Sequence, residues 1–128
     1  MSLKNKLRVM ILDDMSVSRG LLVQALEEIG ISNIVHENNG KSALVSMSST
    51  PVHLVISDYN MPEMDGLHLL HYLRNSPQTQ KVGFLLITGR ADPAIINKGK
   101  QLGMNNYIAK PFQPADLKSA IESIVGRL

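Results

Sequence analysis

Short apolar runs alternate along the chain with longer segments in which apolar residues recur at helical spacing. The runs are too short for helices and are continuous rather than alternating, a pattern typical of strands covered on both faces of a parallel sheet. We therefore predict strands at residues 9–12, 34–37, 52–57, 82–87 and 107–109, of which the second has the weakest pattern.

Each predicted strand is followed by a segment with one apolar stripe, which predicts a helix. The last segment has the clearest pattern, because its apolar residues fall on one side of a helix while charged residues fall on the other. The residues that define the five stripes are Leu21, Leu22, Ala25, Leu26 and Ile29; Ala43, Leu44 and Met47; Leu67, Leu70 and Leu73; Ile95, Ile96 and Leu102; and Leu117, Ala120, Ile121, Ile124, Val125 and Leu128.

Local signals predict where some of these helices begin and end. Ser16 or Ser18 is expected to cap the first helix, and Gly30 is expected to end it. Asp92, which precedes a proline, is typical of a helix start. Residues 38–40, Asn-Asn-Gly, have the composition of a turn.

Strand and helix thus alternate five times, without repeats, low-complexity tracts or linkers. Crossovers between parallel strands are right-handed in nearly all proteins, and helices then cover both faces of the sheet. The predicted fold class is therefore α/β, with a doubly wound five-stranded parallel sheet in a single domain.

Composition narrows the functional classes. The 128 residues suffice for one domain, and a net charge of +2 gives no strong attraction to nucleic acid or to an acidic membrane. The chain has no cysteine, which excludes disulfides, thiol catalysis and cysteine-ligated zinc, and agrees with a reducing cytoplasm. The polar first residues indicate neither a signal peptide nor a membrane anchor.

Four of the predicted strands end in polar residues that carry candidate chemistry. Asp13 and Asp14 follow the first strand, Asp58 the third, Thr88 the fourth and Lys110 the fifth. Because the carboxyl ends of parallel strands lie along one edge, these side chains are expected to share one pocket, where open α/β sheets place their ligands. Asp58, at the centre, is the predicted reactive group.

Three carboxylates in one pocket raise each other's pKa unless a cation neutralises them. Mg²⁺ suits this set, because it prefers oxygen ligands and commonly partners phosphate. We expect Asp14 and Asp58 to bind it directly, Asp13 through water, and the backbone carbonyl of Asn60 to add a further oxygen.

The same residues predict phosphoryl chemistry. Asp58 would attack a phosphoryl group in line, and positioning with electrostatics would supply most of the catalysis. Mg²⁺ would take one phosphoryl oxygen, Lys110 a second, and the Thr88 hydroxyl with the N–H of Gly89 a third.

These residues, in this order and spacing, closely resemble the receiver domain of bacterial two-component response regulators. Within that family the chain most resembles the stand-alone chemotaxis regulators of the CheY type. The resemblance covers residues 7–128, leaving residues 1–6 as an N-terminal extension that has in part the character of a cloning remnant. The matching positions are Asp13-Asp14, Asp58-x-Asn60-Met61-Pro62-x-Met64-Asp65-Gly66, Thr88, Tyr107 and Lys110-Pro111-Phe112.

The resemblance implies a flavodoxin-like strand order 2-1-3-4-5 and a phosphoryl donor that is a histidine kinase. Thr88 would move toward the phosphoryl group and Tyr107 would swing inward, which would alter the face formed by the fourth helix, fifth strand and fifth helix. A downstream protein, in motor control a flagellar switch protein, would dock there. The peptide bond before Pro111 is expected to be cis. Gly89 replaces the usual alanine, and Arg90 lies where side chains influence access of the hydrolytic water.

The resulting hypothesis is a cytoplasmic, monomeric signalling protein that catalyses only its own phosphotransfer and dephosphorylation. A phosphate sink that drains the kinase, or a receiver excised from a larger regulator, would share this pattern; an ending without a linker favours a stand-alone protein.

Alternatives outside signalling have weaker support. A haloacid-dehalogenase-type phosphatase also uses a strand-end aspartate, but it needs a general acid where Asn60 stands. A flavin-binding module would need a phosphate-cradling glycine loop that is not obvious here. His68 and His71 share a helix face without a third ligand nearby, so surface histidines are favoured over zinc. No helix-turn-helix or basic stripe indicates DNA binding.

Overall fold

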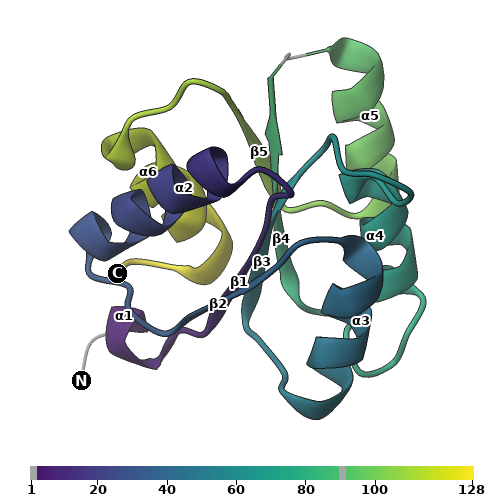
Figure 1. The fold of residues 1–128 in the computed structure, drawn as a ribbon, viewed down its shortest axis with the longest axis horizontal. Coiled ribbons are helices and arrows are strands. Elements are labelled where there is room, and N and C mark those ends of the chain that lie inside the picture. The colour runs from purple at the N-terminus through teal and green to yellow at the C-terminus, as the bar shows by residue number, and fades with distance from the viewer. Residues whose placement is uncertain (1–2, 90–91) are drawn as a thin grey trace.

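The structure, a computed structural model, describes residues 3–89 and 92–128. Its centre is a five-stranded parallel sheet in the order β2-β1-β3-β4-β5, which confirms the predicted fold class and strand order (Figure 1). The strands are β1 (Val9–Leu12), β2 (Ile34–Glu37), β3 (Leu54–Asp58), β4 (Gly83–Thr88) and β5 (Asn106–Ala109).

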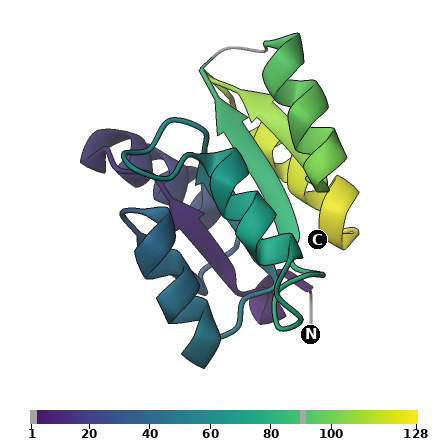
Figure 2. The same ribbon diagram turned by 90° about the vertical axis from the view of Figure 1, so that its right-hand side faces the viewer.

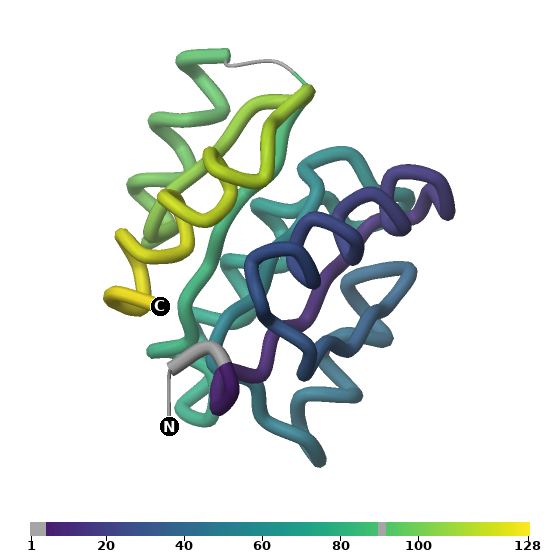
Figure 3. Tube along the Cα trace, turned by 90° about the vertical axis from the view of Figure 1, so that its left-hand side faces the viewer, coloured from purple at the N-terminus to yellow at the C-terminus, as the bar shows by residue number. Residues whose placement is uncertain are grey.

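Helices cover both faces of this sheet. Helices α2 and α6 lie on one face (Figure 3), and α3, α4 and α5 lie on the other (Figure 2). None of the helices in the described ranges is long and apolar enough to cross a membrane. The helices are α1 (Leu3–Lys6), α2 (Ser16–Ile29), α3 (Gly40–Ser49), α4 (Gly66–Arg74), α5 (Pro93–Leu102) and α6 (Pro114–Val125).

The continuous apolar runs of the central strands reflect this double cover. All residues of β1, β3 and β4 are buried, and successive side chains enter opposite cores. Val9 and Ile11 pack with α2 and α6, whereas Met10 and Leu12 pack with α3 and α4. Two hydrophobic cores therefore hold the sheet from both sides and fix the direction in which each strand end points.

Several predicted helix ends are confirmed. Gly30 ends α2 as predicted, in the left-handed conformation at φ 104°. Gly103 ends α5 in the same conformation at φ 96°. The Asp92 side chain caps α5 by accepting a hydrogen bond from the N–H of Ala94. Residues 38 and 39 form a bend in the predicted turn, whereas Gly40 is already the first residue of α3, which Asn39 caps by accepting a hydrogen bond from the N–H of Ser42.

The expected serine cap of α2 is wrong. Met15 occupies the N-cap position and makes no side-chain cap, while Asp13 accepts the N–H of Met15 at 3.0 Å. Neither Ser16 nor Ser18 caps the helix, because the bond from the Met15 N–H to Asp13 already turns the chain into it. The hydroxyl of Ser18 has another partner, described below.

Other boundaries differ by one to three residues. Strands β3 and β4 end on Asp58 and Thr88 themselves, because ladder pairing extends one residue beyond the apolar runs. Helix α6 ends at Val125, so Leu128 packs on the core from outside the helix. Helix α1 was not predicted, since its few residues carry no periodic pattern.

Gly66 permits a close approach beneath the strand ends. A Cβ atom on Gly66 would lie 2.6 Å from the backbone oxygen of Asp58 and 2.9 Å from Leu86 Cδ1. The first of these contacts is with backbone, which cannot rotate away as a side chain can. The N–H of Gly66 also donates to the carbonyl of Tyr59 at 2.9 Å, so α4 starts directly against the end of β3.

Gly66→Ala is therefore expected to destabilise the fold by about 1–3 kcal/mol, the usual cost of forcing extra atoms into a packed site. The matched control is Gly20→Ala at an exposed position of α2, where a Cβ would meet nothing within 4 Å. That change should stabilise the helix by about 1 kcal/mol, because alanine has the higher helix propensity. Urea unfolding midpoints measure both, and equal effects would contradict the packing argument.

Candidate functional site

Three carboxylates meet at the carboxyl edge of the sheet. Strand β1 pairs with β3 so that Leu12 lies beside Ser57, which places the next residues, Asp13 and Asp58, side by side. One ligand oxygen from each of Asp13, Asp14 and Asp58 lies within 4.8 Å of the others. Asp13 is 2% exposed and Asp58 8%, whereas Asp14 is exposed. The structure thus brings together the predicted acidic cluster.

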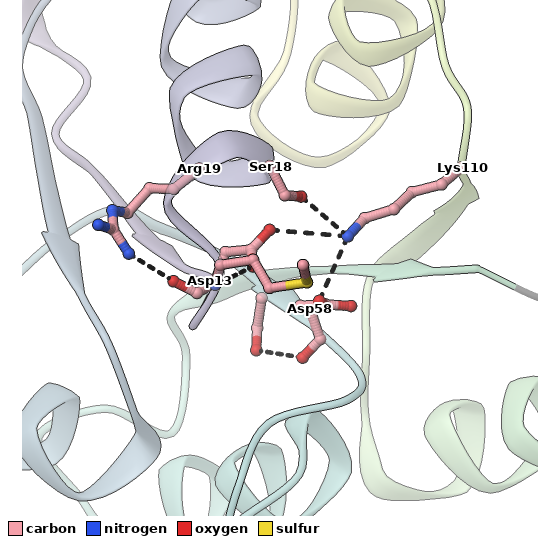
Figure 4. A network of polar contacts seen from close by, with 7 residues as sticks. Asp13, Ser18, Arg19, Asp58 and Lys110 are labelled. Atoms are coloured by element: carbon pink, nitrogen blue, oxygen red, sulfur yellow. Dashed lines mark hydrogen bonds and ion pairs between the residues drawn. The ribbon is translucent and has the colours of Figure 1, made fainter.

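Lys110 brings the positive charge to this cluster. Its Nζ lies 3.2 Å from Asp58 Oδ2 and 3.6 Å from Asp13 Oδ2 (Figure 4). Lys110 directly follows β5, and β4 lies between β5 and β3 in the sheet, so the side chain joins the ends of two strands that are not neighbours. The Lys110–Pro111 peptide bond is cis, as expected, and the N–H of Lys110 donates to the carbonyl of Thr88 at 2.8 Å.

Burial raises the pKa of Asp58 above the ordinary aspartate value, and the neighbouring charge of Asp13 adds to this. The charge and hydrogen bond of Lys110, together with the backbone N–H of Asn60, act in the opposite direction without cancelling the burial. Among the described residues, Lys110 is the one ammonium in ion-pair contact with any of these three carboxylates, so a further cation would stabilise their ionised forms.

The remaining predicted residues lie at or near the carboxyl ends of β4 and β5. Thr88 ends β4 and is 2% exposed. Gly89 is exposed, and a Cβ there would meet nothing within 4 Å, so the space above its backbone is open. Tyr107 is half-buried in β5 and packs with the core on the α3–α5 side. Arg90 lies outside the described residues.

Two residues that pattern reading missed complete the network. Arg19 donates to the carbonyl of Asp13 at 2.9 Å (Figure 4). It also donates to Asn38 Oδ1 at 3.1 Å, which ties the β1–α2 loop to the β2–α3 loop. Ser18 accepts a hydrogen bond from Lys110 Nζ at 3.1 Å. The sequence places Ser18 and Arg19 in the first helical turn after Asp14, which indicates that they lie near the site. It does not indicate which residues far along the chain they contact.

The donor set fits Mg²⁺. All three side chains offer carboxylate oxygens, and Mg²⁺ favours such hard ligands while retaining waters. In residues 3–89 and 92–128 no other group of three or more acidic or histidine residues converges in this way. Asp13, Asp14 and Asp58 would hold the ion; the predicted contribution of the Asn60 carbonyl remains a prediction.

The sequence matches the response regulator receiver domain family over residues 9–122. The chain belongs to this family. The match includes every residue of the cluster, from Asp13 to Lys110, which supports the resemblance read from the motifs.

Two full-length relatives of this chain are named as chemotaxis proteins. A protein of Rhizobium etli named "Probable chemotaxis protein CheY" is 42% identical over 100% of this chain and 99% of its own length. Chemotaxis protein CheY-3 of Vibrio cholerae is 32% identical over 98% of this chain and 97% of its own.

Solved structures show the same fold. Vibrio cholerae CheY4 is 25% identical and superposes with a TM-score of 0.85 over 92% of this chain and 98% of its own. The receiver domain of a histidine kinase from Syntrophus aciditrophicus is 30% identical and superposes with a TM-score of 0.83 over 94% of this chain and 91% of its own. The chain is therefore a CheY-like receiver domain.

The raised pKa of Asp58 predicts a pH-dependent effect of Asp58→Asn. A proton binds more tightly to Asp58 in the folded chain than in the unfolded chain. Stability is therefore lost as pH rises from the ordinary aspartate range through the folded-state pKa. Without divalent metal, the asparagine variant should have the higher urea midpoint at neutral pH, and the gap should close on acidification.

The control for this comparison is Asp92→Asn, since asparagine caps a helix about as well as aspartate. It should stay within about 0.5 kcal/mol of the parent, as surface changes usually do. An Asp58→Asn protein no more stable than the parent at neutral pH would show that burial does not dominate the site.

Proposed function

We propose that this receiver takes a phosphoryl group from a histidine kinase onto Asp58 and uses the phosphorylated state to bind another protein. The observation that carries the proposal is the contact between the buried Asp58 carboxylate and the Lys110 ammonium inside an acidic, Mg²⁺-compatible pocket. Membership of the family supports the donor class, and the chemotaxis relatives support a role in chemotaxis.

Each residue has a distinct part in the proposed transfer. An oxygen of Asp58 forms the bond to phosphorus while the donor's bond to phosphorus breaks and its electron pair leaves with the donor. Lys110, the Thr88 hydroxyl and the N–H of Gly89 receive phosphoryl oxygens, on which charge spreads in the transition state. Mg²⁺, held by the three aspartates, would neutralise the remaining negative charge.

The output of the proposed switch is the face made by α5, β5 and α6. Thr88 and Tyr107 lie on neighbouring strands and are offset by two residues in register, since Leu86 pairs with Tyr107 and Thr88 with Ala109. A shift of Thr88 toward a phosphoryl group would make room for the ring of Tyr107 to move inward. The proposed target in motor control is a flagellar switch protein; a phosphate sink needs no such target.

The wider expectations remain part of the proposal: a receiver domain spanning residues 7–128, monomeric, cytoplasmic and without a turnover substrate. A phosphatase of the haloacid dehalogenase type stays less favoured, because Asn60 cannot act as a general acid. Sustained hydrolysis of phosphate esters would revive it.

Phosphorylation is the direct test of Asp58. Incubation with Mg²⁺ and acetyl phosphate should add the mass of one phosphoryl group, because a small acyl phosphate can replace the kinase as donor. Asp58→Asn should abolish the addition, Asp92→Asn should leave it intact, and chelation of divalent metal should prevent it in the parent. A phosphoryl group that persists on the Asp58→Asn protein would remove the assignment.

Capture by flagellar switch components separates motor control from a phosphate sink. With beryllofluoride as a phosphoryl mimic, a motor regulator should be retained by these components more strongly than without it, and Asp58→Asn should show no increase. Pull-down with purified switch proteins measures the difference. Equal retention, combined with rapid transfer from the kinase, would favour the sink.

A further inference from the structure

The ammonium of Lys110 has three hydrogens and three oxygen neighbours. Two are carboxylate oxygens, on Asp58 and Asp13, and the third is the hydroxyl oxygen of Ser18 at 3.1 Å (Figure 4). In the described part of the chain, Ser18 and Asp58 accept hydrogen bonds from Nζ, whereas Asp13 at 3.6 Å is an ion-pair contact. The hydroxyl therefore accepts one of two hydrogen bonds from an ammonium that can donate three. Ser18 differs from the other two neighbours because it carries no charge.

The position of Ser18 is set by helix α2 and not by the loop that carries Lys110. Leu22, Ala25 and Leu26 bury the same helix against the sheet, so its first turn is held in place. The next residue, Arg19, donates to the carbonyl of Asp13. One helical turn thus contacts the ammonium through Ser18 and supports an acidic residue through Arg19.

The Ser18 hydroxyl does not cap helix α2. Helix α2 starts at an N-cap without a side-chain hydrogen bond, so Ser18 does not serve the helix end. Ser18 instead lines a cavity of about 650 Å³ between α2 and the β5–α6 loop, together with Lys110 and Gly89. The cavity borders the place where a phosphoryl group would approach Asp58.

Phosphorylation of Asp58 changes the charged partners of Lys110 but leaves Ser18 unchanged. One aspartate oxygen becomes bonded to phosphorus, the donor departs with the electron pair of the broken bond, and Lys110 keeps its proton throughout. The ammonium must then point one hydrogen at a phosphoryl oxygen. A neutral acceptor on a fixed helix can hold one N–H direction before, during and after this step.

We infer that Ser18 is a positioning residue for phosphotransfer: its hydroxyl orients the Lys110 ammonium toward the incoming phosphoryl oxygens. This role rests on the proposed function and adds a residue to it. The expected size of the effect is that of one hydrogen bond, which corresponds to about a two- to ten-fold change in rate.

Two variants of nearly equal shape isolate the hydroxyl. Ser18→Thr keeps it and Ser18→Val replaces it with a methyl group. At saturating Mg²⁺ and with acetyl phosphate as donor, Ser18→Val should lower the initial rate about two- to ten-fold relative to Ser18→Thr. Both should bind Mg²⁺ with equal affinity by calorimetry. Ser16→Ala, on an exposed residue of the same turn, should keep the parental rate.

A second measurement needs no phosphorylation. In metal-free protein, the urea midpoint of Ser18→Val should fall below that of Ser18→Thr, and this difference should vanish when both carry Lys110→Met. Loss of the difference would show that the hydroxyl acts through the ammonium, because the effect of side-chain shape on α2 is the same in both backgrounds.

The outcomes separate this inference from the function on which it rests. If Asp58→Asn still accepts phosphate at the parental rate, the proposed function fails. If Asp58 is the acceptor but Ser18→Val and Ser18→Thr react at the same rate, only the positioning role fails. It also fails if the midpoint difference persists with Lys110→Met, or if weaker Mg²⁺ binding accounts for the slower rate.

Discussion

Repulsion among three closely placed carboxylates is the constraint on which this molecule depends. Asp13, Asp14 and Asp58 have ligand oxygens within 4.8 Å of one another, and two of the three side chains are buried. Lys110 offsets part of that charge, but burial still raises the pKa of Asp58. Repulsion in a site of this kind is unfavourable, and a divalent cation is suited to relieve it.

The rest of the fold holds these groups against their repulsion. Parallel pairing of β1 with β3 sets Asp13 beside Asp58, and the two hydrophobic cores prevent either strand from shifting its register. Gly66 lets α4 begin directly against the end of β3. On the other side, α2 contributes Arg19 and Ser18, which contact the Asp13 backbone and the Lys110 ammonium. Stability of the helices and geometry of the site are therefore linked.

The proposed signalling role follows from the way the site joins distant segments. Lys110 and Asp58 are 52 residues apart, and Lys110 and Ser18 are 92 apart, yet all three meet at one ammonium. In the proposed switch, a phosphoryl group on Asp58 would contact Thr88 at the end of β4 and Lys110 in the loop after β5, and so could change the positions of both elements. Those elements border the α5–β5–α6 face, so a local change of charge can alter a surface that another protein contacts.

The alternation of apolar runs and stripes by itself determined the layers and the parallel sheet, because strands buried on both faces need continuous apolar runs. It also determined the edge at which the functional residues converge, because parallel strands share one carboxyl edge. These residues are Asp13, Asp58, Thr88 and Lys110. Local pattern did not identify the partner of Ser18, the clamp of Arg19 or the contact that requires glycine at position 66. Those features depend on strand register and on how helices seat against the sheet. A serine near the start of a helix is expected to cap it, but Ser18 does not. Only its distance to Lys110 in the folded chain shows that its hydroxyl contacts the ammonium.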